Sequence, residues 1–126
     1  MYALFLMFDG RVFAQGYGHG FNQVLNSGSP IIQVRFDPGA SICKIIAYRT
    51  FIFYISTRGI CYFTCTQLRS HHCEGPCLQP KLLQTEAGFF VENVFITEDY
   101  IIIQFDGSGV GNIYLLNATG PKLGGW

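Results

Sequence analysis

The sequence predicts an all-β fold: a partial β-propeller built from four-stranded blades of about 50 residues each. Three observations predict it: apolar runs rich in Phe, Tyr, Ile and Val, three hairpin-like segments, and the regular spacing of those segments along 126 residues. Aromatic and β-branched residues favour strands, and no window of the sequence shows sustained helical periodicity. The alternative is a β-sandwich whose hairpins are alike only because all hairpins share a pattern.

Each hairpin-like segment consists of an apolar run, a turn with a central glycine, and a second apolar run. The segments are residues 3–16, 51–65 and 100–117, with Gly10, Gly59 and Gly107 at their centres. An Asp-Gly pair between apolar runs predicts a tight turn, because such turns need residues with positive φ. The glycines follow one another at intervals of 49 and 48 residues, which is the length of a propeller blade.

The segments between the hairpins repeat as well. Pro30 and Pro80 lie 50 residues apart, and the runs 42–49 and 91–98 each lead into the next hairpin. Two independent sets of landmarks therefore give nearly the same period, and we expect roughly ten strands.

These landmarks predict one domain over residues 1–120. It would hold a half blade at about 1–28, a full blade at about 29–78 and a second at about 79–117, followed by a C-terminal tail at 121–126.

The composition excludes several classes of partner. The net charge is zero, with eight basic and eight acidic residues, so no basic face is expected for nucleic acid or for an anionic membrane. No apolar run is long enough to span a bilayer, and the first ten residues lack the features of a secretory leader. Five cysteines, an odd number, fit free thiols. We expect an intracellular, cytoplasmic protein without nucleic-acid or membrane partners.

One polar cluster has residue types that could bind zinc, because thiolate and imidazole suit a tetrahedral site. Its members are Cys65, His71, His72, Cys73 and Cys77. Their spacing contains no Cys-x-x-Cys, and buried free cysteine is commonly a small apolar residue. We therefore favour no metal and no other cofactor, and retain a zinc-binding all-β domain as an alternative.

Catalytic readings are weak. Cys73 beside His72, with Glu74 as an orienting group, would be a nucleophile only if adjacent side chains converged, which is rare. The glycine-rich run 16–20 is not followed by a helical pattern, so a phosphate loop is not indicated. We expect no enzymatic activity.

A group of residues carries a resemblance to a known repeat. In the first hairpin they are Leu4, Leu6, Asp9, Gly10, Val12, Phe13 and Gly16, and further along they are Pro30, Pro80 and the strand 44–47. This pattern resembles the repeat of the regulator of chromosome condensation family, a seven-bladed propeller. Gln15 and Thr64 stand where that repeat has tryptophan.

The resemblance implies about two and a half blades, which leaves sheet edges and faces uncovered. Exposed edges pair readily with other chains, so we expect a protein partner or self-association through exposed strand edges. Tyr100 and Ile102, in a strand almost without charge, and Trp126, in the tail, are the expected interaction residues.

The leading functional hypothesis is a non-catalytic protein–protein interaction or scaffold module within a larger assembly. Because the family includes a nucleotide-exchange factor for a small GTPase, the resemblance also allows a regulatory binder of a small GTPase.

Overall fold

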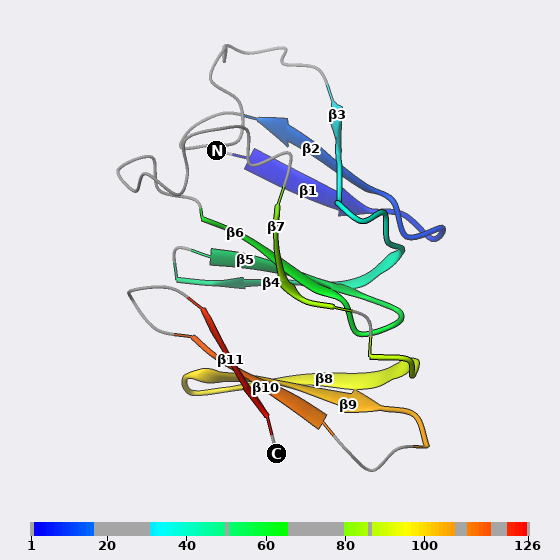
Figure 1. Ribbon diagram of the computed structural model, residues 1–126. Helices are drawn as coiled ribbons and strands as arrows, with labels where there is room; N and C mark the ends of the chain where they lie inside the picture. Colours follow the sequence, from blue (N-terminus) through cyan, green and yellow to red (C-terminus); the bar gives the residue numbers. More distant parts are fainter. Residues whose placement is uncertain are drawn as a thin grey trace.

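The computed structural model describes residues 2–16, 31–49, 51–65, 80–85, 87–107, 111–116 and 121–125. These residues form strands and no helix, and the strands make three antiparallel sheets stacked one on another (Figure 1). The predicted all-β fold is confirmed. No described segment is a helix that could cross a membrane.

The sheets follow the order of the chain and are called sheets 1, 2 and 3. Sheet 1 has the strand order β1-β2-β3, with β1 (Tyr2–Leu6), β2 (Val12–Gly16) and β3 (Ile32–Val34). Sheet 2 has the order β4-β5-β6-β7, with β4 (Ile42–Tyr48), β5 (Phe51–Ser56), β6 (Cys61–Cys65) and β7 (Lys81–Gln84). Sheet 3 has the order β11-β10-β9-β8, with β8 (Val91–Thr97), β9 (Tyr100–Phe105), β10 (Gly111–Leu115) and β11 (Lys122–Gly125).

The three predicted hairpins are present as β1-β2, β5-β6 and β9-β10. Their turn glycines, Gly10, Gly59 and Gly107, all have positive φ, at 88°, 82° and 71°. This left-handed conformation is open to glycine at little cost, whereas a Cβ would make it strained. The glycine landmarks of the sequence therefore mark real turns.

The sheet boundaries differ from the expected blade boundaries at 29–78 and 79–117. The strand that follows each proline, β3 or β7, pairs with the preceding hairpin and does not open the next sheet. Residues 122–125, expected to be a tail, form β11 and pair with β10. In each case one more strand extends the ladder of the preceding hairpin, because its backbone groups find partners there.

The expectation that the strand at 100–105 is an exposed edge is wrong. This strand, β9, lies between β8 and β10 and is paired on both sides. The edges of sheet 3 are β8 and β11. Tyr100 and Ile102 therefore lie on a face of the sheet, where only side chains are accessible. They do not lie on an edge strand with unpaired backbone groups.

Two apolar cores hold the stack together, one between each pair of neighbouring sheets. Between sheets 1 and 2 the buried residues are Val12, Ala14, Val34, Ile42, Ile52, Tyr54, Ile60 and Tyr62. Between sheets 2 and 3 they are Phe51, Phe53, Ile55, Cys61, Ile101, Ile103, Phe105, Tyr114 and Leu116. Successive side chains of a strand point to opposite faces, so β5 supplies both cores and is buried at all six positions.

Candidate functional site: the outer faces of the stack

The outer face of sheet 3 is the surface that points away from sheet 2. In β9 the inner residues Ile101 and Ile103 are fully buried, so the alternating residues Tyr100 and Ile102 lie on the opposite, outer face. Tyr100 is 41% exposed, and Ile102 is half-buried. The two residues proposed from the sequence thus share one surface.

Cross-strand neighbours extend this surface into two apolar rows. Directly opposed residues of an antiparallel pair share a face. The register therefore places Phe95 and Ile113 beside Ile102, and Leu115 beside Tyr100. Phe95 is 48% exposed. We call these five residues the sheet 3 outer face.

A polar row borders the sheet 3 outer face on one side. Asn93 and Gln104 lie opposite each other in the register, and the Asn93 Nδ2 donates to the Gln104 Oε1 at 3.5 Å. An apolar centre with a polar border is the usual arrangement of a protein–protein interface.

The equivalent face of sheet 2 is covered by a neighbouring sheet. When the strand registers of sheets 2 and 3 are aligned, Phe51 and Phe53 of β5 are equivalent to Tyr100 and Ile102 of β9. Each precedes its equivalent by 49 residues. Ile46 of β4 likewise occupies the place of Phe95. Sheet 3 packs on this side of sheet 2, and Phe51 and Phe53 are 8% and 0% exposed. The sheet 3 outer face is therefore the counterpart of a face that is buried one sheet earlier.

The outer face of sheet 1 lies at the other end of the stack. Val12 and Ala14 of β2 face sheet 2, so Phe13 and its cross-strand neighbour Phe5 lie on the side away from it. Phe5 is 41% exposed, and the guanidinium carbon of Arg11 lies 5.5 Å from the centre of the Phe13 ring. We call Phe5 and Phe13 the sheet 1 outer face.

β1 also differs from its counterparts at its open edge. β5 is flanked by β4 and β6, and β9 by β8 and β10, whereas β1 is paired within the described residues only with β2. Among the described residues, β1 is therefore an edge strand and β9 is not.

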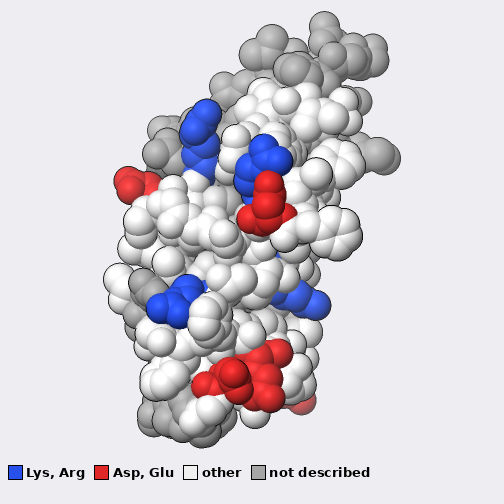
Figure 2. Space-filling view, turned by 90° about the vertical axis from the view of Figure 1, so that its right-hand side faces the viewer, with Lys and Arg blue, Asp and Glu red and all other residues white. Residues whose placement is uncertain are grey.

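Backbone contacts fix the spacing of neighbouring sheets on the side of the hairpin turns. The Ile42 N–H donates to the Gly10 carbonyl at 2.9 Å, which links sheet 2 to the turn of sheet 1. The Val91 N–H donates to the Thr57 carbonyl at 2.9 Å, which links sheet 3 to the turn of sheet 2. Figure 2 shows that this side is mostly uncharged, with one basic and one acidic group in contact and the other charged groups apart.

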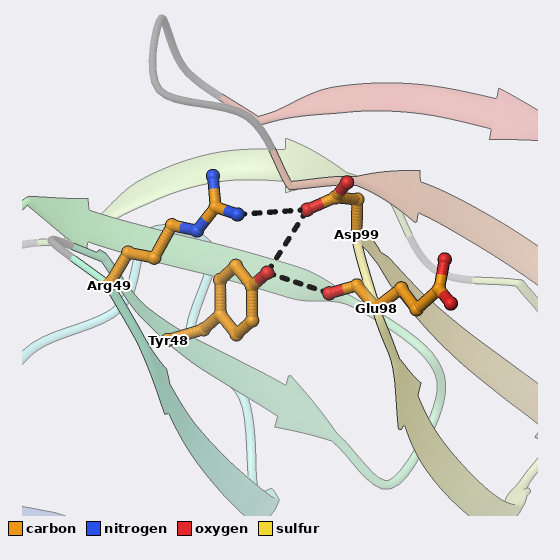
Figure 3. Close-up of polar contacts among 4 residues, drawn as sticks. All are labelled: Tyr48, Arg49, Glu98 and Asp99. Carbon is orange, nitrogen blue, oxygen red and sulfur yellow. Dashed lines mark hydrogen bonds and ion pairs between the residues drawn. The ribbon is translucent and has the colours of Figure 1, made fainter.

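A polar cluster joins sheets 2 and 3 at the opposite ends of the strands (Figure 3). The Tyr48 hydroxyl donates to the Glu98 carbonyl at 2.6 Å and contacts the Asp99 Oδ1 at 3.1 Å. The Arg49 Nη2 donates to the same Asp99 oxygen at 3.1 Å. Arg49 and Glu98 hold equivalent places in their turns, and both have positive φ, at 53° and 37°.

The described cysteines give little support to nucleophilic or metal chemistry. Cys61 is fully buried, and this burial raises the pKa of its thiol, so that it stays protonated at neutral pH. Cys43 lies at the surface on β4 as a free thiol. Among the described residues, no three His, Cys, Asp or Glu side chains are grouped as they would be around a metal ion.

Several residues proposed from the sequence lie outside the described residues. They are His71, His72, Cys73, Cys77 and Trp126. Cys65 is the last residue of β6 and pairs with Phe51 in the ladder. The structure therefore does not bring the proposed zinc ligands together or separate them.

The sequence reasoning missed Phe95, Ile113 and Leu115 on sheet 3, and Phe5 and Phe13 on sheet 1. Each lies in an apolar run whose two faces look alike in the sequence. The signal that could have found the first of them is the spacing of 49 residues between Ile46 and Phe95.

Comparison with solved structures identifies the architecture. The crystal structure of human WBSCR16 superposes on 97% of this chain with a TM-score of 0.58 at 17% sequence identity. WBSCR16 is a β-propeller-like protein of the regulator of chromosome condensation type. The three sheets are thus successive blades of a partial β-propeller, as predicted, and the two-layer sandwich alternative is set aside.

The similarity shows the fold alone, and the chain spans 35% of the WBSCR16 chain. No family model matches the chain. No curated protein matches it either.

Proposed function

We propose that this chain is a non-catalytic protein–protein interaction module, a short run of propeller blades that docks within a larger assembly. The single observation that carries the proposal is the state of the sheet 3 outer face. Tyr100 and Ile102 occupy places that are buried in sheet 2, whereas in sheet 3 Tyr100 is exposed and Ile102 is half-buried.

The exposed surface is of the kind that proteins cover. Tyr100, Ile102, Phe95 and their neighbours are contiguous across three strands, and contiguous apolar patches rimmed by polar residues mark interaction sites. Stacked repeats bury their faces on neighbours, so a repeat whose apolar face is uncovered offers a site for a partner. The proposed partner is therefore a protein that presents a complementary apolar surface, as sheet 3 itself does toward sheet 2.

The relationship to regulator of chromosome condensation repeats is part of this proposal. The fold similarity to WBSCR16 and the residues of the first hairpin support it. The buried, protonated thiol of Cys61 is not available as a nucleophile, which is consistent with a non-catalytic interaction module.

Site-specific photocross-linking tests the proposed function. Phe95 would be replaced by benzoylphenylalanine in the full chain, which is irradiated in an extract of its native source. The matched control is the same replacement at Phe89, which is equally exposed, at 49% against 48%, but lies in the loop between β7 and β8.

The proposal expects a discrete cross-linked protein from position 95, at several times the yield from position 89. An excess of unlabelled wild-type chain should suppress the product, whereas an excess of the Phe95→Asp chain should not. Equal yields from the two positions, or suppression by both competitors alike, would show that the sheet 3 outer face is not a docking surface.

A further inference from the structure

The two outer faces of the stack belong to one repeating arrangement. We infer that they bind each other, so that the sheet 3 outer face of one copy packs on the sheet 1 outer face of a second copy of this chain. This inference rests on the proposed function and names its partner.

The internal interfaces define what such a contact must contain. Where sheet 1 packs on sheet 2, sheet 2 presents the rings of Tyr54 and Tyr62, both fully buried, toward Val12 and Val34. The ring of Phe36 completes this packing, with its centre 5.2 Å from Tyr54 and 4.8 Å from Tyr62. Sheet 2 thus presents a pair of aromatic rings to sheet 1, whereas sheet 3 presents Ile103 and Asn112 to sheet 2 at the equivalent places.

Sheet 1 presents such a pair on its outer face. In sheet 1, Phe5 and Phe13 are equivalent by register to Tyr54 and Tyr62 of sheet 2, and each precedes its equivalent by 49 residues. The members of each pair lie directly opposite each other in their hairpin. The chain therefore carries on the outer face of sheet 1 the kind of aromatic pair that sheet 2 uses where it packs on sheet 1.

Sheet 3 carries the other half of the contact. Its outer face repeats the places of Phe51, Phe53 and Ile46, which receive the next sheet within this chain. If sheet 1 of a second copy stacked on sheet 3 as sheet 3 stacks on sheet 2, its Phe5 and Phe13 would lie over Tyr100 and Ile102. The five residues of the sheet 3 outer face bear no formal charge, and the nearest charged position in the ladder is Lys122, opposite Leu115 at the border of this face.

A second copy fits better than an unrelated protein because one chain supplies both halves of the interface. Head-to-tail contacts of this kind close into a ring when the rotation per copy allows it. Two copies would place six sheets in succession, and closed propellers have about four to eight blades. We therefore expect a dimer with about twice the mass of the 14.1 kDa chain.

Variants at each face, studied singly and mixed, test this inference. Phe95→Asp blocks the sheet 3 outer face, Phe5→Asp blocks the sheet 1 outer face, and Phe89→Asp is the matched control at an equally exposed phenylalanine. Mass is measured by size exclusion with light scattering, and circular dichroism melting shows that each variant is folded.

The inference predicts that the wild-type chain and Phe89→Asp have twice the monomer mass. Each blocked variant alone should be a monomer, while an equimolar mixture of the two should recover the dimer mass, because each supplies the face that the other lacks. This rescue by mixing is specific to a head-to-tail contact.

Three results would overturn the inference. They are a wild-type monomer at all concentrations, a dimer that survives Phe5→Asp, and a mixture that stays monomeric although both variants are folded. If the photocross-linking at position 95 still captured a different protein, the proposed function would stand while self-association would fail. If neither experiment showed position dependence, both would fail.

Discussion

Strands β5 and β9 hold the same place in neighbouring sheets, yet they differ in burial. β5 is buried at all six positions, whereas β9 is fully buried only at Ile101, Ile103 and Phe105. Both are apolar runs with strands paired on either side. The difference lies in the number of sheets that pack on them: β5 has two, and β9 has one. Burial in this fold is therefore decided by neighbouring sheets, and under the proposed function the apolar outer side of β9 is where a partner would pack.

The largest expected effect comes from truncating equivalent side chains in the two strands. Phe53→Ala should lower the free energy of unfolding by about 3–5 kcal/mol, because it removes a fully buried ring and leaves a cavity. Ile102→Ala, at the equivalent place, should cost about 1 kcal/mol or less in dilute chain, because this side chain lies on the outer face and is only half-buried. Urea denaturation of both variants measures this, and equal costs would contradict the comparison.

Two turn glycines give the next effect. Gly59→Ala would place a Cβ against the buried ring of Phe105 and 3.1 Å from the Ala87 Cβ, at the junction of sheets 2 and 3. Gly107→Ala, in the turn of sheet 3, would meet no atom of the described residues within 4 Å.

Both glycine substitutions carry the cost of positive φ, about 1–2 kcal/mol, but only Gly59→Ala adds overpacking of about 1–3 kcal/mol. Thermal unfolding followed by circular dichroism should therefore rank Gly59→Ala as the more damaging change. The reverse order would mean that the turn of sheet 2 is not packed against sheet 3.

The polar cluster between sheets 2 and 3 contributes less. Tyr48→Phe removes the hydroxyl that donates to the Glu98 carbonyl and should cost about 0.5–1.5 kcal/mol. Asp99→Asn weakens an exposed ion pair with Arg49 and should cost about 0.2–1 kcal/mol. A double-mutant cycle for these two substitutions should show coupling, since both act on the Asp99 carboxylate. Strict additivity would indicate that the contacts at this end are not formed in solution.

The smallest expected effect is a pH dependence at the turn of sheet 1. The backbone N–H of Arg11 and then its guanidinium lower the pKa of Asp9 below its ordinary value of 3.8. The associated stability is therefore present above about pH 3.8 and is lost as the pH falls through the lower folded-state pKa. An NMR titration of the Asp9 carboxyl carbon measures the pKa, and Arg11→Gln should move it back toward 3.8. An Asp9 pKa at or above 3.8 in the wild-type chain would show that the Arg11 contacts are absent.

The fold class and the hairpins could be predicted from the sequence because their signals are local. Glycine turns between apolar runs identify β1-β2, β5-β6 and β9-β10, and their spacing gives the blade length. The strands after Pro30 and Pro80 were assigned to the wrong sheet, because a ladder partner is chosen by tertiary pairing. A proline marks a boundary but does not say which neighbour the next strand joins.

The candidate faces were harder to predict because they depend on register. The glycine landmarks place Gly59 and Gly107 48 residues apart, whereas the ladders align β5 and β9 at 49. Gly59 is the fourth residue after the last ladder position of β5, and Gly107 is the third after that of β9. A slip of one residue sends every side chain to the opposite face. In a run such as residues 101–103, three consecutive isoleucines, nothing in the sequence corrects the slip.

The most direct test of the central claim is carbene footprinting with mass spectrometry on the chain in its native assembly and on the same chain after dissociation. Phe89, exposed in the loop before β8, serves as the internal reference. The account predicts that Phe95 and Tyr100 are labelled several-fold less in the assembly than after dissociation, while Phe89 changes little. Equal labelling of Phe95 and Tyr100 in the two states would show that no partner covers this face.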